Sequence, residues 1–163
     1  MHTRLATVED AATIAAIYNQ GIVDRTSTFE TRHRTADDVR AGFDDRHPII
    51  VVENNDGVIA FASTSTYRPR DCYAGIAEFS VYVERDTRGR GAGRLAMEAL
   101  LIAAEQRGFW KLVSRVFVEN VASLTLLHRL GFREVGVYEK HGQLDGVWRD
   151  VVIVEKLIAA NVK

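Results

Sequence analysis

The chain has 163 residues, of which 47% are hydrophobic and 26% charged, and its formal net charge is −1. This balance is typical of one globular domain with a sizeable core, spanning residues 1–163, and it argues against a disordered or membrane-embedded chain. Because the charge is close to neutral, no overall field draws the protein onto nucleic acid or anionic lipid, and we expect neither as a partner.

The N-terminal stretch up to Gln20 interrupts its apolar positions with charged residues, unlike a signal peptide or a membrane span. The only cysteine, Cys72, has no partner for an internal disulfide, which suits a reducing compartment. We therefore expect a cytoplasmic protein. The five histidines are scattered without ligand spacing, so we expect no metal site.

Hydrophobic periodicity and turn residues predict strands and helices in the order β, α, α, β, β, β, α, β, α, β, β. Thr7 and Asp10 have the spacing of a capping pair at the start of the first helix. This order predicts an α/β sandwich with a mixed sheet rather than the strict alternation of a doubly wound fold. The predicted strands cover 4–6, 49–53, 58–66, 76–83, 112–118, 133–137 and 148–156, and the later helices cover 35–45, 91–107 and 122–130.

A turn rich in glycine and arginine separates the predicted strand at 76–83 from the helix at 91–107. Glycine lets the backbone approach a ligand closely, and the first free N–H groups of a helix point outward, as in phosphate-binding turns. Arginine adds charge and can donate two parallel hydrogen bonds to phosphate oxygens. The alternative is a flexible surface turn with solvated arginines. The residues of this turn are Arg88, Gly89, Arg90, Gly91, Ala92, Gly93 and Arg94.

The turn does not match a Walker loop, which requires Lys followed by Ser or Thr where this chain has Arg94 and Leu95. It instead resembles the acyl-CoA pyrophosphate loop of the GNAT superfamily of N-acetyltransferases. The pattern of that loop is Arg or Gln, two residues, Gly, one residue, and Gly or Ala, which residues 88–93 satisfy.

Over nearly its whole length the chain also resembles the phosphinothricin, methionine sulfoximine and arsinothricin acetyltransferases of that superfamily. Two stretches, at 73–80 and 109–115, look most like the arsinothricin branch. The other matching segments are 15–19, 28–30, 67–70, 78–93, 119–120 with Ser123, 130–136, and Gly146 with Trp148 and Asp150.

This resemblance implies a single-domain GNAT fold with a mixed, mostly antiparallel sheet of about six or seven strands flanked by helices. It also implies acetyl-CoA as co-substrate, a small amino-acid analogue as acceptor, and a homodimer. Acetyl-CoA would lie along Val81, Tyr82 and Val83, whose backbone would pair with the pantetheine and polarise the thioester carbonyl through an N–H. The turn at 88–94 would hold the pyrophosphate.

The resemblance further implies that Asn120 and Ser123 contact the CoA arm, with ordinary helix capping as the alternative. Glu78 is the candidate base, because the amine must be neutral to attack and Glu78 lies on the strand that carries the cofactor. A structural carboxylate paired across the sheet is the alternative for Glu78. Phe79 and Ser80, next to it, would contribute to the acceptor site.

Arg68 and Arg70 precede that strand and would pair with the acidic head of the acceptor, which is a phosphinate, an arsonate or a carboxylate. Solvated loop charge is the alternative for both. Phe29 and Tyr73 would form walls of the acceptor pocket, although aromatic side chains there equally suit the core.

Two departures from the relatives stand out. Leu127 occupies the position, four residues before a Gly-Phe pair, where many relatives have a Tyr or His that protonates the departing thiolate. His128 is one step further along the helix, which turns its side chain by about 100°, so we expect a surface histidine. The thiol of CoA should have a pKa of about 8.5 and can leave without a dedicated acid. The second departure, at 143–145, bears on the identity of the acceptor.

We therefore predict direct transfer of acetyl from acetyl-CoA to the α-amino group of a small acidic amino-acid analogue. Arsinothricin or phosphinothricin is the first choice and methionine sulfoximine the second, and acetylation would confer resistance by detoxification. Two alternatives stay open. One is acetylation of a protein N-terminus or a polyamine, which an acidic groove would favour, and the other is a non-catalytic acyl-CoA-binding module.

Overall fold

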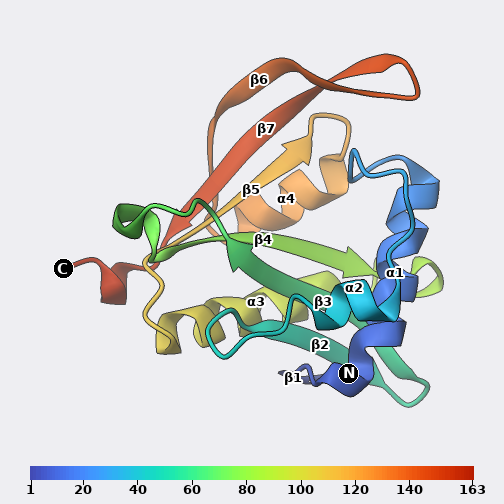
Figure 1. Ribbon diagram of the computed structural model, residues 1–163, viewed down its shortest axis with the longest axis horizontal. Coiled ribbons are helices and arrows are strands. Elements are labelled where there is room, and N and C mark those ends of the chain that lie inside the picture. The colour runs from blue at the N-terminus through green and yellow to red at the C-terminus, as the bar shows by residue number, and fades with distance from the viewer.

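The computed structural model describes residues 1–163 and contains one seven-stranded sheet with helices on both faces (Figure 1). The strands lie in the order β1-β2-β3-β4-β5-β7-β6, and every neighbouring pair is antiparallel except β4 with β5. This confirms the predicted α/β class and mixed sheet. The strands are β1 (His2–Leu5), β2 (Ile49–Asn54), β3 (Gly57–Thr66), β4 (Ile76–Val83), β5 (Lys111–Phe117), β6 (Arg133–Leu144) and β7 (Val147–Leu157). The helices are α1 (Ala11–Asp24), α2 (Ala36–Arg40), α3 (Ala92–Gln106) and α4 (Val121–Arg129).

Two elements differ in length from their predictions. Helix α2 ends at Arg40 instead of continuing to residue 45. Beyond it the Asp44 carboxylate accepts hydrogen bonds from the backbone N–H groups of Arg46 and His47, which forms a turn in place of further helix. Strand β6 continues to Leu144 rather than ending at residue 137, because its backbone pairs with β7 even where its side chains are exposed.

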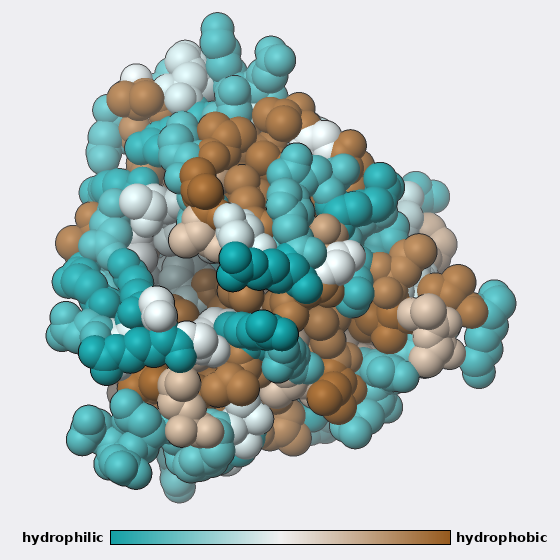
Figure 2. All heavy atoms as spheres, turned by 180° about the vertical axis from the view of Figure 1, so that it is seen from behind, coloured by the Kyte–Doolittle hydropathy of each residue, from teal (hydrophilic) through white to brown (hydrophobic).

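The two faces of the sheet are covered by different helices. Helix α3 packs against one face, where Met97 and Leu100 are completely buried, and α1 packs against the other through Ile17. Because side chains alternate along a strand, the neighbours Val51 and Val52 belong to opposite cores. At the surface, hydrophobic atoms emerge in several patches separated by hydrophilic side chains (Figure 2). None of the helices combines the length and the apolar character needed to cross a bilayer.

An ionic cluster fixes the start of α1 to the sheet. Asp10, which directly precedes α1 and is 9% exposed, accepts two hydrogen bonds of 2.8 Å from the Arg4 guanidinium. It accepts a third from the backbone N–H of Thr7, as the capping pair predicts. Arg4 also forms an ion pair of 2.5 Å with Glu53 on β2. The hydrogen bonds from Arg4 outweigh the effect of burial and lower the pKa of Asp10 below its ordinary value.

Asp10→Asn should lower the free energy of unfolding by about 2 kcal/mol at pH 7, because it removes hydrogen bonds between charged groups. A lowered pKa means that this stability is present above the unfolded-state value of about 3.9 and is lost as pH falls through the folded-state value. Urea unfolding from pH 7 down to about pH 3 should therefore show the difference between the two proteins shrinking below about pH 4.

Asp56→Asn, in the exposed turn between β2 and β3, is the control and should change stability by less than about 0.5 kcal/mol. A loss in Asp10→Asn that stays constant over the whole pH range would contradict the assigned ion pair.

Candidate active site

Strands β4 and β5 run parallel but separate soon after they begin. They are paired only from Ile76 with Lys111 to Glu78 with Val113, although β4 continues to Val83. Each strand keeps its other neighbour, β3 for β4 and β7 for β5, so neither can turn back to close the gap. The two strands therefore diverge towards their C-terminal ends (Figure 1).

Backbone groups of β4 face this gap. The carbonyl oxygen of Gly75 accepts from the N–H of Trp110 at 2.8 Å, and that of Phe79 accepts from the hydroxyl of Ser114 at 2.9 Å. Both carbonyls therefore point towards β5. Because alternate residues of a strand direct their N–H and C=O groups to the same side, the backbone of Val81 also faces the gap.

Two cavities open where the strands separate. The narrower cavity, of about 50 Å³, lies in the gap itself, and the larger one, of about 290 Å³, lies beside α1. A molecule bound in one cavity can therefore reach a molecule bound in the other. The two share Ser27, Phe79, Ser80, Tyr82, Ser114 and Arg115. The narrower cavity is further lined by Val81, Val116, Asn120, Ser123 and Leu127. The larger is further lined by Tyr18, Thr28, Phe29, Glu30, Arg34, Glu78, Phe117, His141 and Val151.

The glycine-rich turn has the backbone of an anion site. Gly89 and Gly91 have φ angles of 77° and 90°, and a Cβ at either would meet nothing within 4 Å. The first hydrogen bond of α3 runs from the N–H of Leu95 to the carbonyl of Gly91. The three N–H groups of residues 92–94 are thus free to donate to a bound anion.

One arginine of the turn is held by α1. Arg88 Nη1 lies 3.0 Å from Asp24 Oδ2, and its Nε donates to the carbonyl of Val83 at 3.2 Å. Asp24 also pairs with Arg85 at 2.6 Å. Hydrogen bonds from Arg85 and then Arg88 lower the pKa of Asp24 against the effect of burial. Arg88 therefore keeps the turn against the end of α1.

The other two arginines of the turn are less restrained. Arg94 pairs with Glu98 one helical turn further, at 2.8 Å, and more than half of the Arg94 side chain is exposed. Arg90 forms no ion pair and is exposed. Both can reorient towards an anion at the turn.

Asn120 and Ser123 meet at the start of α4, beside the narrower cavity. The Asn120 side chain accepts from the N–H of Ser123 at 3.3 Å and so caps α4, while both residues line the narrower cavity. Leu127, one turn later, is completely buried and lines the same cavity. His128 turns away, because its Nε2 lies 3.1 Å from the Glu134 carboxylate and it lines neither cavity.

Glu78 lies in the larger cavity with an arginine that sequence analysis missed. Its Oε1 is 3.4 Å from Nη2 of Arg115, and about a third of its side chain is exposed. Glu78, Ser80 and Tyr82 share the cavity side of β4 because side chains alternate along a strand. Arg115 ends the stretch at 109–115 that resembles the arsinothricin branch, but no motif in that stretch assigns it a role. It reaches Glu78 only because β5 begins in register beside β4.

Among the other predicted acceptor residues, the structure brings Phe29 into the larger cavity, where its ring packs edge-on against Phe117 at 4.8 Å. Phe79 lines both cavities. The remaining three lie on the loop between β3 and β4 and line neither cavity. The Arg68 guanidinium lies 5.0 Å from the centre of the Tyr67 ring. These three are Arg68, Arg70 and Tyr73.

Residues 143–145, where the sequence departs from its relatives, lie behind the rings of Phe29 and Phe117. Leu144 is 2% exposed and belongs to the small core of Phe117, against which Phe29 packs. Asp145 forms an ion pair of 3.1 Å with Arg25. The segment therefore shapes the larger cavity from behind.

These features together fit acetyl-CoA. The free N–H groups at 92–94 suit a pyrophosphate. The narrower cavity, with the Val81 backbone on one side and Asn120 on the other, suits an extended arm that ends in a carbonyl. The larger cavity meets it at the shared residues and leaves room for an amine.

Several known proteins are similar to this chain in sequence and in fold. The profile described as Acetyltransferase (GNAT) family matches residues 14–132. The L-methionine sulfoximine/L-methionine sulfone acetyltransferase of Pseudomonas aeruginosa is 34% identical over 157 residues, which cover 93% of this chain and 91% of that protein. The phosphinothricin N-acetyltransferase of Alcaligenes faecalis is 30% identical, over 97% of this chain and 83% of that protein. The solved structure of yncA from Salmonella typhimurium with its cofactor acetyl-CoA has a TM-score of 0.92 and 29% identity, covering 97% of this chain and 94% of that one. This chain therefore belongs to the GNAT family of acetyltransferases.

Proposed function

We propose that this N-acetyltransferase acetylates the α-amino group of a small acidic amino-acid analogue. Arsinothricin or phosphinothricin is the first choice and methionine sulfoximine the second, and acetylation detoxifies the compound. The observation that carries the proposal is the junction of the two cavities, with Glu78 on the acceptor side and the Val81 backbone on the cofactor side. Arg34 and Arg115 in the larger cavity suit an acceptor that carries an acid beside its amine. The names of the relatives support the same class of acceptor.

In the proposed mechanism Glu78 takes a proton from the amine through a water molecule as the amine attacks. Arg115, 3.4 Å away, orients the carboxylate. The N–H of Val81 donates to the carbonyl oxygen on which negative charge develops. The new C–N bond forms as the C–S bond breaks, so acetyl passes directly to the amine without a covalent enzyme intermediate. Apolar Leu127 offers no proton, and none is needed because the leaving thiol has a pKa of about 8.5.

The proposed cofactor contacts follow the geometry of the turn and the gap. The N–H groups of residues 92–94, with Arg90 and Arg94, hold the pyrophosphate. Asn120 and Ser123 contact the pantetheine arm. Arg88 contributes by holding the turn in place through Asp24.

The loop between β3 and β4 is proposed to act on the acceptor from outside the cavity. Arg68 and Arg70 are exposed and positively charged, so they attract an acidic head towards the opening. Tyr73 packs edge-on against Tyr67 at 5.9 Å and supports this loop.

A cytoplasmic homodimer is proposed as the working form. The β6–β7 hairpin extends beyond the rest of the sheet (Figure 1) and carries apolar side chains that are about half exposed. Covering them with a second copy would remove apolar surface from water. They are Val137 at 50%, Tyr138 at 49%, Val147 at 57% and Trp148 at 54%.

The function is tested by measuring CoA release from acetyl-CoA with arsinothricin, phosphinothricin, methionine sulfoximine and spermidine in parallel. At least one of the amino-acid analogues should have a kcat/KM more than about tenfold above that of spermidine, which carries no acid for the arginines. A preference for spermidine would favour the polyamine alternative. Binding of acetyl-CoA with no turnover of any acceptor would favour the non-catalytic alternative.

Glu78→Gln should lower kcat about hundredfold, because an amide does not accept the proton. The KM for acetyl-CoA should stay within about twofold, and the acidic limb of the kcat–pH profile should disappear. Glu105→Gln, on the exposed side of α3, is the matched control and should leave kcat and the kcat–pH profile unchanged. If Glu78→Gln keeps the wild-type pH profile, Glu78 is a structural carboxylate.

Gly91→Ala should weaken acetyl-CoA binding about tenfold, because a φ of 90° strains alanine and its methyl group would occupy the open space of the turn. Titration calorimetry measures the Kd. Gly57→Ala, with a φ of 118° and equally open surroundings at the start of β3, imposes similar strain away from the site. Equal changes of Kd in the two variants would disprove the anion site.

A further inference from the structure

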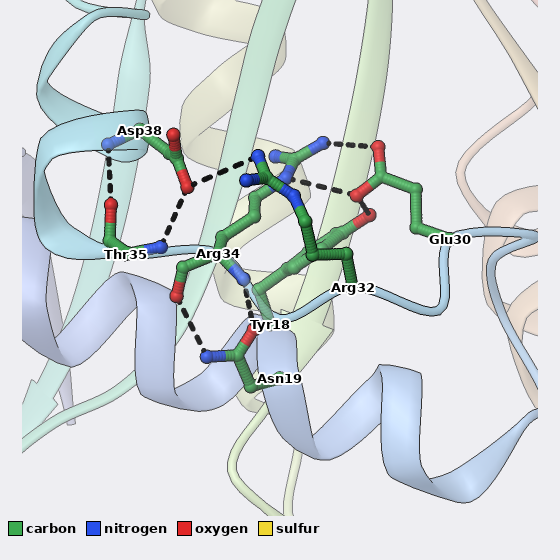
Figure 3. A network of polar contacts seen from close by, with 7 residues as sticks. All are labelled: Tyr18, Asn19, Glu30, Arg32, Arg34, Thr35 and Asp38. Atoms are coloured by element: carbon green, nitrogen blue, oxygen red, sulfur yellow. Dashed lines mark hydrogen bonds and ion pairs between the residues drawn. The ribbon is translucent and has the colours of Figure 1, made fainter.

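A polar cluster that takes no part in the proposed proton transfer lies in the wall of the larger cavity. It consists of Tyr18, Glu30 and Arg34, and Figure 3 shows how they face one another. Arg34 donates to Glu30 from Nη2 at 2.9 Å and from Nε at 3.2 Å. The hydroxyl of Tyr18 donates to Glu30 at 2.8 Å, and the Tyr18 ring lies 3.9 Å from the guanidinium carbon of Arg34. The three side chains thus hold one another in a single arrangement.

The backbone of Arg34 is fixed as well. The Asn19 amide donates to the carbonyl of Arg34 at 3.0 Å and accepts from its N–H at 2.9 Å (Figure 3). Both bonds tie the segment 30–34 to α1, which the Arg4 and Asp10 pair anchors to the sheet. An arginine held in this way loses little conformational freedom when it binds a ligand.

The carboxylate of the cluster is satisfied, whereas the guanidinium keeps a free edge. Glu30 accepts three hydrogen bonds, two from Arg34 and one from Tyr18, while Nη1 of Arg34 makes none. Burial opposes the charged form of Glu30, but the hydrogen bonds from Arg34 and Tyr18 outweigh it and lower its pKa. Burial likewise opposes the charge of Arg34, and the bond to Glu30 outweighs it and raises its pKa. The free edge therefore belongs to a permanently charged donor.

The other arginines near the acceptor are less suited to this task. Arg115 is engaged with Glu78, the proposed base. Arg68 and Arg70 lie outside both cavities. Arg34 is therefore the arginine of the cavity that is both braced and free to donate.

We propose that Arg34 binds the α-carboxylate of the acceptor and that Glu30 and Tyr18 are positioning residues that hold it. The acceptors would then be α-amino acids with a free carboxylate. This inference rests on the proposed function, since it presupposes an amino-acid acceptor. Phosphinothricin and methionine sulfoximine have different side-chain groups, and the acid that they share is the α-carboxylate.

The test compares phosphinothricin and methionine sulfoximine with their own α-carboxamides, which keep the amine but lack the charge. Wild-type protein should prefer each acid to its amide about ten- to hundredfold in kcat/KM. Arg34→Gln should raise the KM of both acids by a similar factor, leave the KM of acetyl-CoA unchanged, and abolish the preference for acid over amide. Arg34→Lys keeps the charge without the planar fork of the guanidinium. Its KM for the two acids should lie between those of wild-type protein and Arg34→Gln.

Arg32→Gln is the matched control, because it removes the same charge from the same segment. The Arg32 side chain is 84% exposed, pairs only with Asp38 at 3.7 Å and lies outside both cavities, so neither KM should change. Thermal unfolding checks that each variant is folded. If Arg34→Gln is not folded, the preference for acid over carboxamide is compared between wild-type protein and Arg34→Lys instead.

Equal losses for acid and amide, or an unchanged preference for the acid in the Arg34 variants, would overturn the role of Arg34. If wild-type protein acetylates an acid and its carboxamide equally well, the role of Arg34 is also overturned, but the proposed function stands. Titration calorimetry of the acceptors adds a readout that is independent of turnover. If wild-type protein neither binds nor acetylates phosphinothricin, methionine sulfoximine or arsinothricin, the proposed function and this inference fail together.

Discussion

The separation of two parallel strands is the constraint on which the rest of the structure depends. Strands β4 and β5 share only three residue pairs, and each is then held on its outer side by an antiparallel neighbour. The backbone groups that would have completed the ladder must find other partners. Ser114 supplies one for the carbonyl of Phe79, and the backbone groups of Val81 have no partner across the gap. Both cavities exist because this ladder stops early.

Helix α1 links the larger cavity to the glycine-rich turn. Its start is anchored by Arg4 and Asp10, its middle supplies Tyr18 to the acceptor cavity, and its last residue, Asp24, holds Arg88 of the turn. Gln20 adds a hydrogen bond of 2.8 Å from the backbone N–H of residue 85. This single helix therefore sets the distance between the larger cavity and the glycine-rich turn.

The larger cavity uses two ion pairs of the same composition in opposite ways. In the pair of Glu78 and Arg115 a single contact of 3.4 Å leaves the carboxylate open to the proton transfer proposed for it. In the pair of Glu30 and Arg34 the carboxylate is saturated and the guanidinium is available for an anion. The difference comes from the surroundings, because Tyr18 completes only the second pair. An α-amino acid carries the two complementary groups, an amine and a carboxylate.

The sequence by itself determined the element order, the glycine-rich turn and the position of Glu78 on the cofactor strand. These depend on consecutive residues, since φ angles and the free N–H groups of a helix are set locally. Tertiary structure alone decided which charges meet in the cavity. Glu78 and Arg115 are 37 residues apart in the chain, yet their bond requires atoms within about 3.5 Å. Arg34 likewise resembles any loop arginine until its segment packs on α1. Arg68, by contrast, belongs to a segment that matches the relatives but lies outside the larger cavity. Side-chain contacts across the fold depend on strand register and loop path, which no local pattern specifies.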